Sequence, residues 1–149
     1  IHQHMSHLTM ACNDLTYANC LTRAGKEEDP IARLKLIAQF FLCAHHVNPA
    51  LVQCKVPLNP ILGETFELRR PEFDYFSEQV SHPPPITACY AVDKENNFDY
   101  WMNSEVKTAF WGMSLEIIPV GMTHVKLNNY NEIYSIDRPS TIIHNIIVG

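Results

Sequence analysis

The chain has 149 residues, which is enough for one domain or for part of a larger one. Its 11 Lys and Arg residues against 16 Asp and Glu residues give a net charge of −5, with the eight His residues counted as neutral. This acidic balance argues against general nucleic-acid binding, which needs a basic surface to displace counterions. Hydrophobic residues make up 46% and charged residues 18%, so the chain has material for a packed core and is not expected to be disordered.

Two helices are predicted in residues 1–50. The first is expected over residues 13–24, where Gly25 would end it. The second begins at Asp29 and Pro30, because an Asp cap accepts N–H groups of the first turn and proline is favoured at the first helical position. It is expected to end at residues 48–49, with later turns that are apolar nearly all round and therefore buried. Arg33 and Lys35 are placed on its outer face, and the stripe predicted to face the core consists of Leu34, Ile37, Ala38, Phe41 and Leu42.

The remainder of the chain, residues 57–149, is predicted to be rich in strands. Short segments of Val, Ile, Thr and aromatic residues indicate strands at residues 65–69, 74–81, 86–92, 98–102, 114–118, 123–127, 132–136 and 141–148. Since no helix is predicted between them, an antiparallel meander is expected. The prolines at positions 83–85 lack N–H groups and must lie in a strand break. The predicted fold class is therefore α+β, with N-terminal helices followed by an antiparallel β-meander.

Several other protein classes are disfavoured. The apolar stretch at residues 36–44 is much shorter than the roughly 18 residues of a membrane-spanning helix, and the first residues do not resemble a secretory signal, so we expect a soluble, cytoplasmic protein. The five cysteines include no C-x-x-C pair, which favours reduced thiols. Metal, nucleotide and nucleophile motifs are absent, and Ser81 beside His82 does not make a triad. We therefore expect no metal, no cofactor and no enzymatic activity.

Two polar segments stand out from this background. They are Leu58-Asn-Pro-Ile-Leu-Gly-Glu-Thr-Phe66 and Ser77-Glu-Gln-Val-Ser-His-Pro-Pro-Pro85. Considered only for their backbone, the first segment predicts a turn before a strand, and the second predicts a loop in which prolines interrupt the strand. That interpretation leaves their polar side chains without a role. An anion-binding site needs cations and N–H donors of the kind supplied by Lys55, Asn59, Gln79, Ser81 and His82. From the residues alone, structural turns and a binding site both remain open.

The two segments carry a resemblance to a known family. Glu78-Gln-Val-Ser-His-Pro-Pro-Pro85 is similar to the E-Q-V-S-H-H-P-P signature of the oxysterol-binding protein family at seven of eight positions. Asn59-Pro-Ile-Leu-Gly-Glu64 resembles the N-P-x-L-G-E segment of that family, in the right order and at the right distance. Further matches follow at residues 110–112, 114–121 and 143–146, so the likeness covers nearly the whole chain.

The resemblance implies an intracellular lipid-binding and lipid-transfer domain. Family members hold one sterol or phospholipid inside an incomplete β-barrel closed by an N-terminal lid, and many exchange it for phosphatidylinositol 4-phosphate at membrane contact sites. The resemblance therefore implies a cytoplasmic protein that contacts membrane surfaces transiently and lies peripherally at organelle membranes. It implies neither a nucleic-acid partner nor a transmembrane segment. The family grips the phosphate with a Lys, an Asn and two His residues. The corresponding candidates in this chain are Lys55, Asn59 and His82.

The chain departs from the family pattern at this phosphate site. Pro83 stands where the family has its second signature His, and proline has no N–H to donate. Val56 occupies the position of the family Lys, and Lys55 lies one residue earlier, so in an extended chain its side chain points the other way. Because each lost charged hydrogen bond is worth about 1.5–3 kcal/mol, weaker phosphoinositide binding is expected.

The resemblance also implies a domain more than twice this length. We therefore predict that residues 1–149 are a single partial lipid-binding domain, truncated at both ends, that forms part of an incomplete β-barrel. The favoured function is non-enzymatic lipid binding and transfer. The alternative is a degenerate or truncated paralogue that acts as an interaction or scaffold module without lipid transfer, and an esterase that uses Ser81 is a third reading. The aromatic residues predicted to line the core or the lipid tunnel are Phe40, Phe41, Trp101, Phe110 and Trp111.

Overall fold

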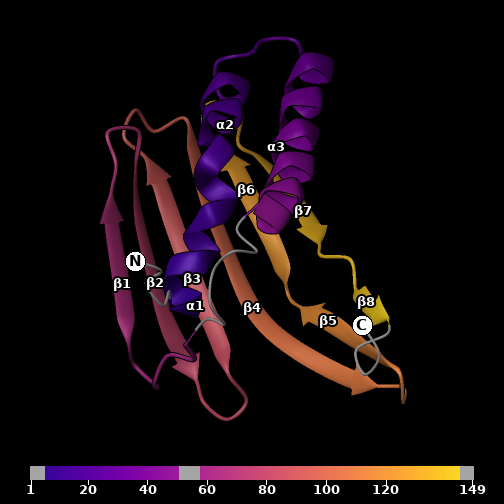
Figure 1. Ribbon diagram of the computed structural model, residues 1–149. Coiled ribbons are helices and arrows are strands. Elements are labelled where there is room, and N and C mark those ends of the chain that lie inside the picture. Colours follow the sequence, from indigo (N-terminus) through magenta and orange to yellow (C-terminus); the bar gives the residue numbers. More distant parts are fainter. Residues whose placement is uncertain (1–5, 51–57, 145–149) are drawn as a thin grey trace.

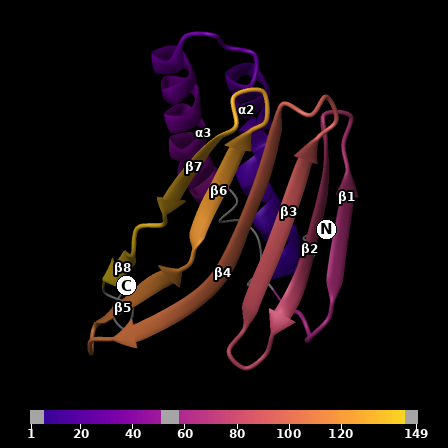
Figure 2. The same cartoon turned by 180° about the vertical axis from the view of Figure 1, so that it is seen from behind.

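The computed structural model describes residues 6–50 and 58–144, and the side chains of all of these except residues 45–50. The helices come first in the chain and are α1 (His7–Ala11), the 3-10 helix η1 (Cys12–Tyr17), α2 (Ala18–Ala24) and α3 (Pro30–Ala50). Figures 1 and 2 show these helices on one face of a sheet, with the other face left uncovered by them. Within the described ranges, no helix is both long and apolar enough to cross a membrane. The predicted order, helices and then an antiparallel sheet, is confirmed.

The described residues form eight strands at or near the predicted positions. They are β1 (Thr65–Arg69), β2 (Phe73–Ser81), β3 (Ile86–Asp93), β4 (Phe98–Phe110), β5 (Ser114–Val120), β6 (Met122–Leu127), β7 (Glu132–Asp137) and β8 (Thr141–His144). β4 is much longer than predicted, because its second half is held mainly by pairing with β5 from Glu105 to Phe110. The prolines at 83–85 lie in the break between β2 and β3, as predicted. Residues 145–148, the predicted end of the last strand, lie outside the described residues.

The strand pairings of the described residues are antiparallel, and β1 to β5 follow the predicted meander, whereas β6 and β8 pair with strands that are not their neighbours in sequence. The strand order is β1-β2-β3-β4-β5-β8, and β6 pairs with β4 and β7. β5 and β6 follow one another along β4 in the same register, with Met102 opposite Thr123 in the β6 part. Gly121 joins the two with a φ of +113°, at a place where a Cβ would overlap the carbonyl oxygen of Asn103. In the described part of the chain the sheet stays open, with β1 and β8 at opposite ends of its order.

Both helix boundaries next to Asp29 and Gly25 are confirmed. The Asp29 carboxylate accepts the N–H groups of Ile31 at 3.1 Å and of Ala32 at 3.3 Å, which is the predicted cap. The earlier helical segment ends just before Gly25, although this glycine keeps a right-handed helical conformation. A glycine is required there for space, since a Cβ would lie 2.7 Å from the Cβ of Asn97.

The other helix boundaries differ from the predictions. The first helical segment begins at His7 instead of residue 13, because the Ser6 hydroxyl accepts the N–H of Leu8 at 3.3 Å and caps an additional turn. α3 continues to Ala50 and does not stop at residues 48–49. Pro49 falls in the last turn of the helix, where the absence of its N–H costs only one hydrogen bond.

The face of α3 that packs on the sheet is also different from the predicted stripe. Ile37 and Phe41 are buried as predicted, together with Phe40. Leu34 and Leu42, however, are 54% and 73% exposed. The prediction that the later turns are buried all round is therefore wrong, because the helix presents only one side to the core.

Arg33 was predicted on the outer face of α3 and is only 5% exposed. Its guanidinium donates to both carboxylate oxygens of Glu132 in β7, at 2.6 and 3.1 Å, and to the carbonyls of Glu27 and Glu28. It also lies 3.8 Å from the ring centre of Tyr130. These contacts satisfy a buried cation and fasten α3 to the β6–β7 hairpin.

The hydrophobic core lies between the helices and the inner face of the sheet. Phe40 of α3 meets Tyr100 of β4 edge to face, with ring centres 6.1 Å apart. Leu21 of α2 and Val125 of β6 are fully buried in the same cluster. Burial alternates along β2 and β3, so one side of each strand faces the helices. This packed layer holds the walls of the pocket described next.

Candidate functional site

The two polar segments identified in the sequence lie side by side. The N–H of Gly63 donates to the carbonyl of Gln79 at 2.9 Å, and the N–H of Gln79 donates to the carbonyl of Glu64 at 3.0 Å. The pairing of β1 with β2 continues from there, with Thr65 opposite Glu78. The fold therefore joins the two segments into one backbone unit.

The first segment forms a tight turn just before β1. The N–H of Glu64 donates to the carbonyl of Ile61 at 3.0 Å, and the Glu64 carboxylate accepts the N–H of Ile61 at 3.1 Å. Gly63 has a φ of +78°, which glycine adopts without the steric cost of a Cβ. Pro60 is buried, whereas Asn59 is exposed beside it. The Pro, Gly and Glu of this pattern thus hold the turn that carries Asn59.

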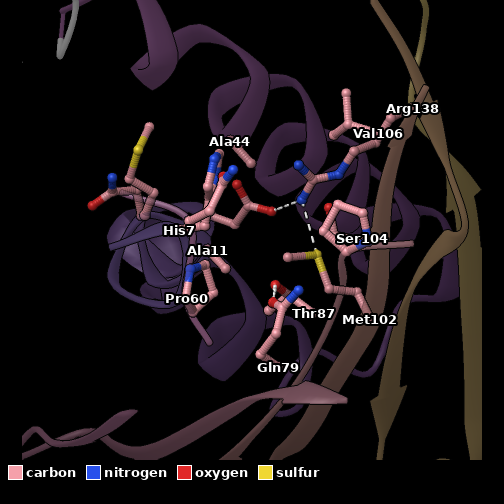
Figure 3. A pocket seen from close by; sticks show the side chains of 15 residues that line it. His7, Ala11, Ala44, Pro60, Gln79, Thr87, Met102, Ser104, Val106 and Arg138 are labelled. Atoms are coloured by element: carbon pink, nitrogen blue, oxygen red, sulfur yellow. Dashed lines mark hydrogen bonds and ion pairs between the residues drawn. The ribbon is translucent and has the colours of Figure 1, made fainter. Parts of the chain in front are cut away.

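A pocket of about 390 Å³ lies next to this turn (Figure 3). Its walls come from α1, η1 and α3 on one side and from β2, β3 and β4 on the other. Residues outside these elements also line it, namely Asn59, Pro60, Pro85 and Arg138. The volume is in the lower part of the range of small-molecule sites, which are mainly apolar with a few placed polar groups. The lining matches that description, with Met10 and Val106 among its apolar side chains.

Gln79 and Thr87 form a fixed polar pair in this pocket (Figure 3). The Gln79 side-chain carbonyl accepts the hydroxyl of Thr87 at 2.7 Å, and its amide donates to the carbonyl of Ser81 at 3.0 Å. Gln79 is only 1% exposed. Its orientation is therefore set by the signature segment itself.

A charged pair lies in another part of the pocket wall. The Asp14 carboxylate accepts the hydroxyl of Tyr100 at 3.1 Å and forms an ion pair with Arg138. Nη2 of the same guanidinium lies 3.0 Å from the sulfur of Met102. Figure 3 shows Arg138 and Met102 facing each other. Burial, followed by the charge of Asp14, raises the pKa of Tyr100 well above its ordinary value, so the hydroxyl remains a donor. The two opposite charges largely compensate each other.

Burial shifts the pKa of three other groups at or near the pocket toward their uncharged forms. Burial lowers the pKa of His7 below 6.5. Burial raises the pKa of the Cys12 thiol to about 11 and that of the Cys89 thiol to about 12, so neither is activated as a thiolate. Across residues 6–50 and 58–144, no group of three or more His, Cys, Asp and Glu side chains is arranged to hold a metal ion.

The three predicted headgroup residues fall in different places. Asn59 lines the pocket. His82 is exposed in the turn after β2 and is not among the described lining residues. Pro83, which replaces the second signature His, is exposed in the same turn. Lys55 lies outside the described residues, so its predicted role stays a prediction.

The family model for the oxysterol-binding protein matches residues 1–149. The chain belongs to the oxysterol-binding protein family. Human oxysterol-binding protein-related proteins 7 and 6 are each 38% identical to it over 151 residues. These alignments cover 100% of this chain but only 18% and 16% of the two relatives. The chain thus spans less than a fifth of the length of these relatives, and the resemblance recognised in its motifs is confirmed.

Solved structures of family members share the fold. The Osh3 ORD in complex with PI(4)P from Saccharomyces cerevisiae superposes with a TM-score of 0.85 and 29% identity, over 97% of this chain and 38% of that chain. The Osh1 ORD domain in complex with ergosterol gives a TM-score of 0.87 and 31% identity, over 99% of this chain and 36% of that one. A further Osh1 ORD structure contains cholesterol. The open antiparallel sheet of this chain is thus part of an oxysterol-binding-protein fold.

Sequence analysis missed the charged pair of the pocket in this family member. Asp14 and Arg138 are 124 residues apart and meet only because the chain that follows β7 returns to η1. Neither residue belongs to a recognised motif. The predicted helix over residues 13–24 contains Asp14, but no local pattern indicated that this carboxylate is buried and requires a partner.

The predicted aromatic wall is confirmed only in part. Phe40 and Phe41 are in the core. Trp101 is partly buried and stacks on a neighbouring ring in β6. Phe110 and Trp111 are 62% and 69% exposed, so for these two the prediction is wrong in this structure. They lie at the turn between β4 and β5, beyond the part of the sheet that the helices cover.

Proposed function

We propose that this chain forms part of a lipid-binding domain that takes up one sterol or phospholipid and transfers it between membranes. The observation that carries the proposal is the pocket of about 390 Å³ between the helices and the sheet, with Asn59 of the family segment in its wall. Solved relatives with PI(4)P, ergosterol and cholesterol support the same ligand classes. The apolar lining favours a hydrocarbon ligand, since each buried CH₂ contributes about 0.8 kcal/mol.

The headgroup of a phosphoinositide would be bound by Asn59 and His82, with Lys55 as a further candidate. Pro83 removes one donor of the family pattern, so we propose that exchange for phosphatidylinositol 4-phosphate is weak in this chain. The reaction is transfer without bond making or breaking. In this proposal the protein is cytoplasmic and associates peripherally with organelle membranes or with their contact sites, where the transfer takes place.

Lipid transfer between liposomes tests the proposal. Donor liposomes contain a fluorescent sterol or phosphatidylinositol 4-phosphate, and the acceptors contain neither. We expect sterol or phospholipid transfer that is faster with the chain than without it, and slower transfer of the phosphoinositide. Pro83→His restores a donor and should raise phosphoinositide transfer, while Pro71→His, also at an exposed proline, serves as the control. If Pro83→His leaves phosphoinositide binding undetectable, the headgroup assignment is wrong.

A scaffold function without lipid transfer is the second candidate. The observation that favours it is the loss of the second signature His to Pro83, together with exposed apolar side chains such as Phe110 and Trp111. Native mass spectrometry separates the two functions. A one-to-one lipid adduct supports the lipid-binding proposal, whereas a lipid-free chain that also transfers no lipid in the liposome assay supports the scaffold.

A further inference from the structure

A row of rings crosses the outer face of the sheet, which is the face opposite the helices. Figure 2 shows β2, β3, β4 and β6 next to one another on this face. Residues paired across antiparallel strands point to the same face, so four successive partners form one line. This aromatic row consists of Phe76 in β2, its partner Tyr90 in β3, then Trp101 in β4 and His124 in β6.

The described residues leave the aromatic row open to solvent. Phe76 is 39% and Tyr90 44% exposed, whereas Tyr75 and Ala91, their neighbours on the same strands, are at most 3% exposed under the helices. Cross-strand aromatic pairs stabilise a sheet, but without a second layer their rings keep an apolar surface that a partner can cover.

Trp101 is held in one orientation and keeps a donor available. Its ring stacks on His124 with centres 5.1 Å apart and planes 19° from parallel. The imidazole is fixed in turn, because its Nδ1 lies 2.7 Å from the hydroxyl of Ser135. The indole Nε1 has no acceptor among the described residues, and it is not one of their buried unpaired groups, so it is open to an incoming carbonyl.

The end of the aromatic row at β1 is acidic. Glu67 is the cross-strand partner of Phe76, is exposed, and forms no ion pair with any described residue. Glu78 lies on the same face, two residues from Phe76. The nearby cations are placed against Asp74 instead: Lys94 pairs with it at 2.8 Å, and Arg69 is its cross-strand partner. A basic side chain would therefore find an uncompensated carboxylate at this end.

The spacing of the rings fits one backbone conformation. A polyproline II helix rises about 3.1 Å per residue with three residues per turn, so each of its edges repeats about every 9.3 Å. Neighbouring strands are about 4.8 Å apart, so every second strand is about 9.6 Å away. A proline-rich segment that crosses the strands thus brings prolines three residues apart onto Phe76 and Trp101. Its carbonyls form no internal hydrogen bonds and can accept the indole N–H.

We propose that the aromatic row is a docking site for a proline-rich segment of another protein, bound as a polyproline II helix with a basic residue at the β1 end. The rings supply apolar contact, Nε1 of Trp101 donates to a backbone carbonyl, and Glu67 pairs with the basic residue. A membrane surface fits less well, because the acidic end would be repelled by anionic headgroups. This inference goes beyond the proposed function and does not depend on lipid binding.

Nuclear magnetic resonance of the indole N–H groups gives the first test. The chain has two tryptophans, so two indole signals are expected, and Trp101→Phe and Trp111→Phe assign them. The probe is a synthetic peptide of two arginines followed by ten prolines. Control peptides replace the prolines with alternating glycine and serine, or the arginines with two glutamates. We expect the proline peptide to shift the Trp101 signal in a saturable way and to leave the Trp111 signal in place.

Calorimetric titration of variants with the same peptide measures each contact. Trp101→Phe keeps a ring but removes the donor, and should weaken binding by about threefold to tenfold. Glu67→Gln changes an exposed side chain and should weaken binding by about twofold to fivefold at low salt, with no difference at high salt. Trp111→Phe and Glu28→Gln, at exposed residues away from the aromatic row, are the matched controls and should bind as the wild-type chain does.

Three results would overturn the docking site. The Trp101 signal may stay in place with the proline peptide, or it may shift equally with the glycine–serine peptide. It may also shift with vesicles of phosphatidylcholine and phosphatidylserine but not with the peptide, which would assign the row to a membrane surface. Each of these results leaves the lipid-transfer proposal standing, because liposome transfer is measured separately and without the peptide.

Discussion

The two halves of β4 differ sharply in what covers them. In the first half, Phe98, Tyr100 and Met102 are at most 2% exposed, because α2, α3 and η1 pack on that face. In the second half, Val106 is 48% and Phe110 62% exposed, and the alternation of burial is lost. One strand thus passes from a covered region to an uncovered one, as Figure 2 shows from the side without helices.

The covered region consists of β2, β3, β6 and the first half of β4, and the uncovered region of β5, β8 and the rest of β4. The pocket lies at the boundary of the two regions, since both Met102 and Val106 line it. Exposed apolar residues such as Trp111, Met113 and Ile143 gather further into the uncovered region. An apolar side chain in a strand therefore does not by itself mark the core. What buries it is a second layer packed against the same face.

Truncating one aromatic ring in each region should give the largest contrast in stability. Phe40→Ala removes a ring that is fully buried against Tyr100 and should lower the free energy of unfolding by about 3–5 kcal/mol. Phe110→Ala removes a ring that is 62% exposed and should change it by about 0.5 kcal/mol or less. Urea denaturation measures both values. Equal losses would mean that the two regions are not distinguished by packing.

A second contrast compares two glycines with left-handed backbone. Gly112→Ala, at a φ of +71° and with nothing within 4 Å of the added Cβ, should cost about 1–2 kcal/mol of unfolding free energy. Gly121→Ala meets the carbonyl of Asn103 as well, so its cost should be larger by about 1–3 kcal/mol. Thermal and urea unfolding of the two variants check this order. A Gly121 variant that is no less stable than the Gly112 variant would contradict the close approach of Gly121 to the Asn103 carbonyl of β4.

The smallest contrast concerns two ion pairs. Arg33→Ala should lower the melting temperature more than Lys26→Ala. Arg33 is buried and pairs with the half-buried Glu132, whereas Lys26 and Glu95 form an exposed pair. Thermal unfolding in low and high salt measures both, and added salt should weaken only the Lys26 effect. Similar shifts for the two variants would show that Arg33 does not fasten α3 to the sheet.

The ion pair between Arg33 and Glu132 should also make the melting temperature depend on pH in a definite direction. The hydrogen bonds from Arg33 hold the pKa of Glu132 below its ordinary 4.5. A carboxyl whose pKa is lower in the folded state stabilises the fold above its unfolded pKa, and this contribution is lost as the pH falls from there through the folded value. Arg33→Ala should therefore make the fall in melting temperature below pH 4.5 shallower. An unchanged pH profile would contradict the pairing.

Sequence rules correctly predicted the parts of the fold that are set by residues close together in the chain. The cap at Asp29 and the bounds of β1 follow from a few adjacent side chains, and both are confirmed. The orientation of α3 was predicted wrongly because hydrophobic spacing placed Arg33 outside and Leu42 inside. Its burial depends on Glu132, 99 residues away, which no local pattern reveals.

The candidate site divides in the same way. Asn59 and His82 were both predicted from short motifs, and of these two only Asn59 is among the described lining residues of the pocket. Asp14 and Arg138 were missed because only the completed sheet brings them together.

Photo-cross-linking with a diazirine-bearing sterol, followed by peptide mass spectrometry, tests most directly whether lipid enters the pocket of the covered region. The account predicts labelling of residues that line it, such as Met10 and Met102, and competition by unlabelled sterol or phospholipid. Labelling confined to the exposed apolar residues around Trp111 and Met113, without competition, would contradict it.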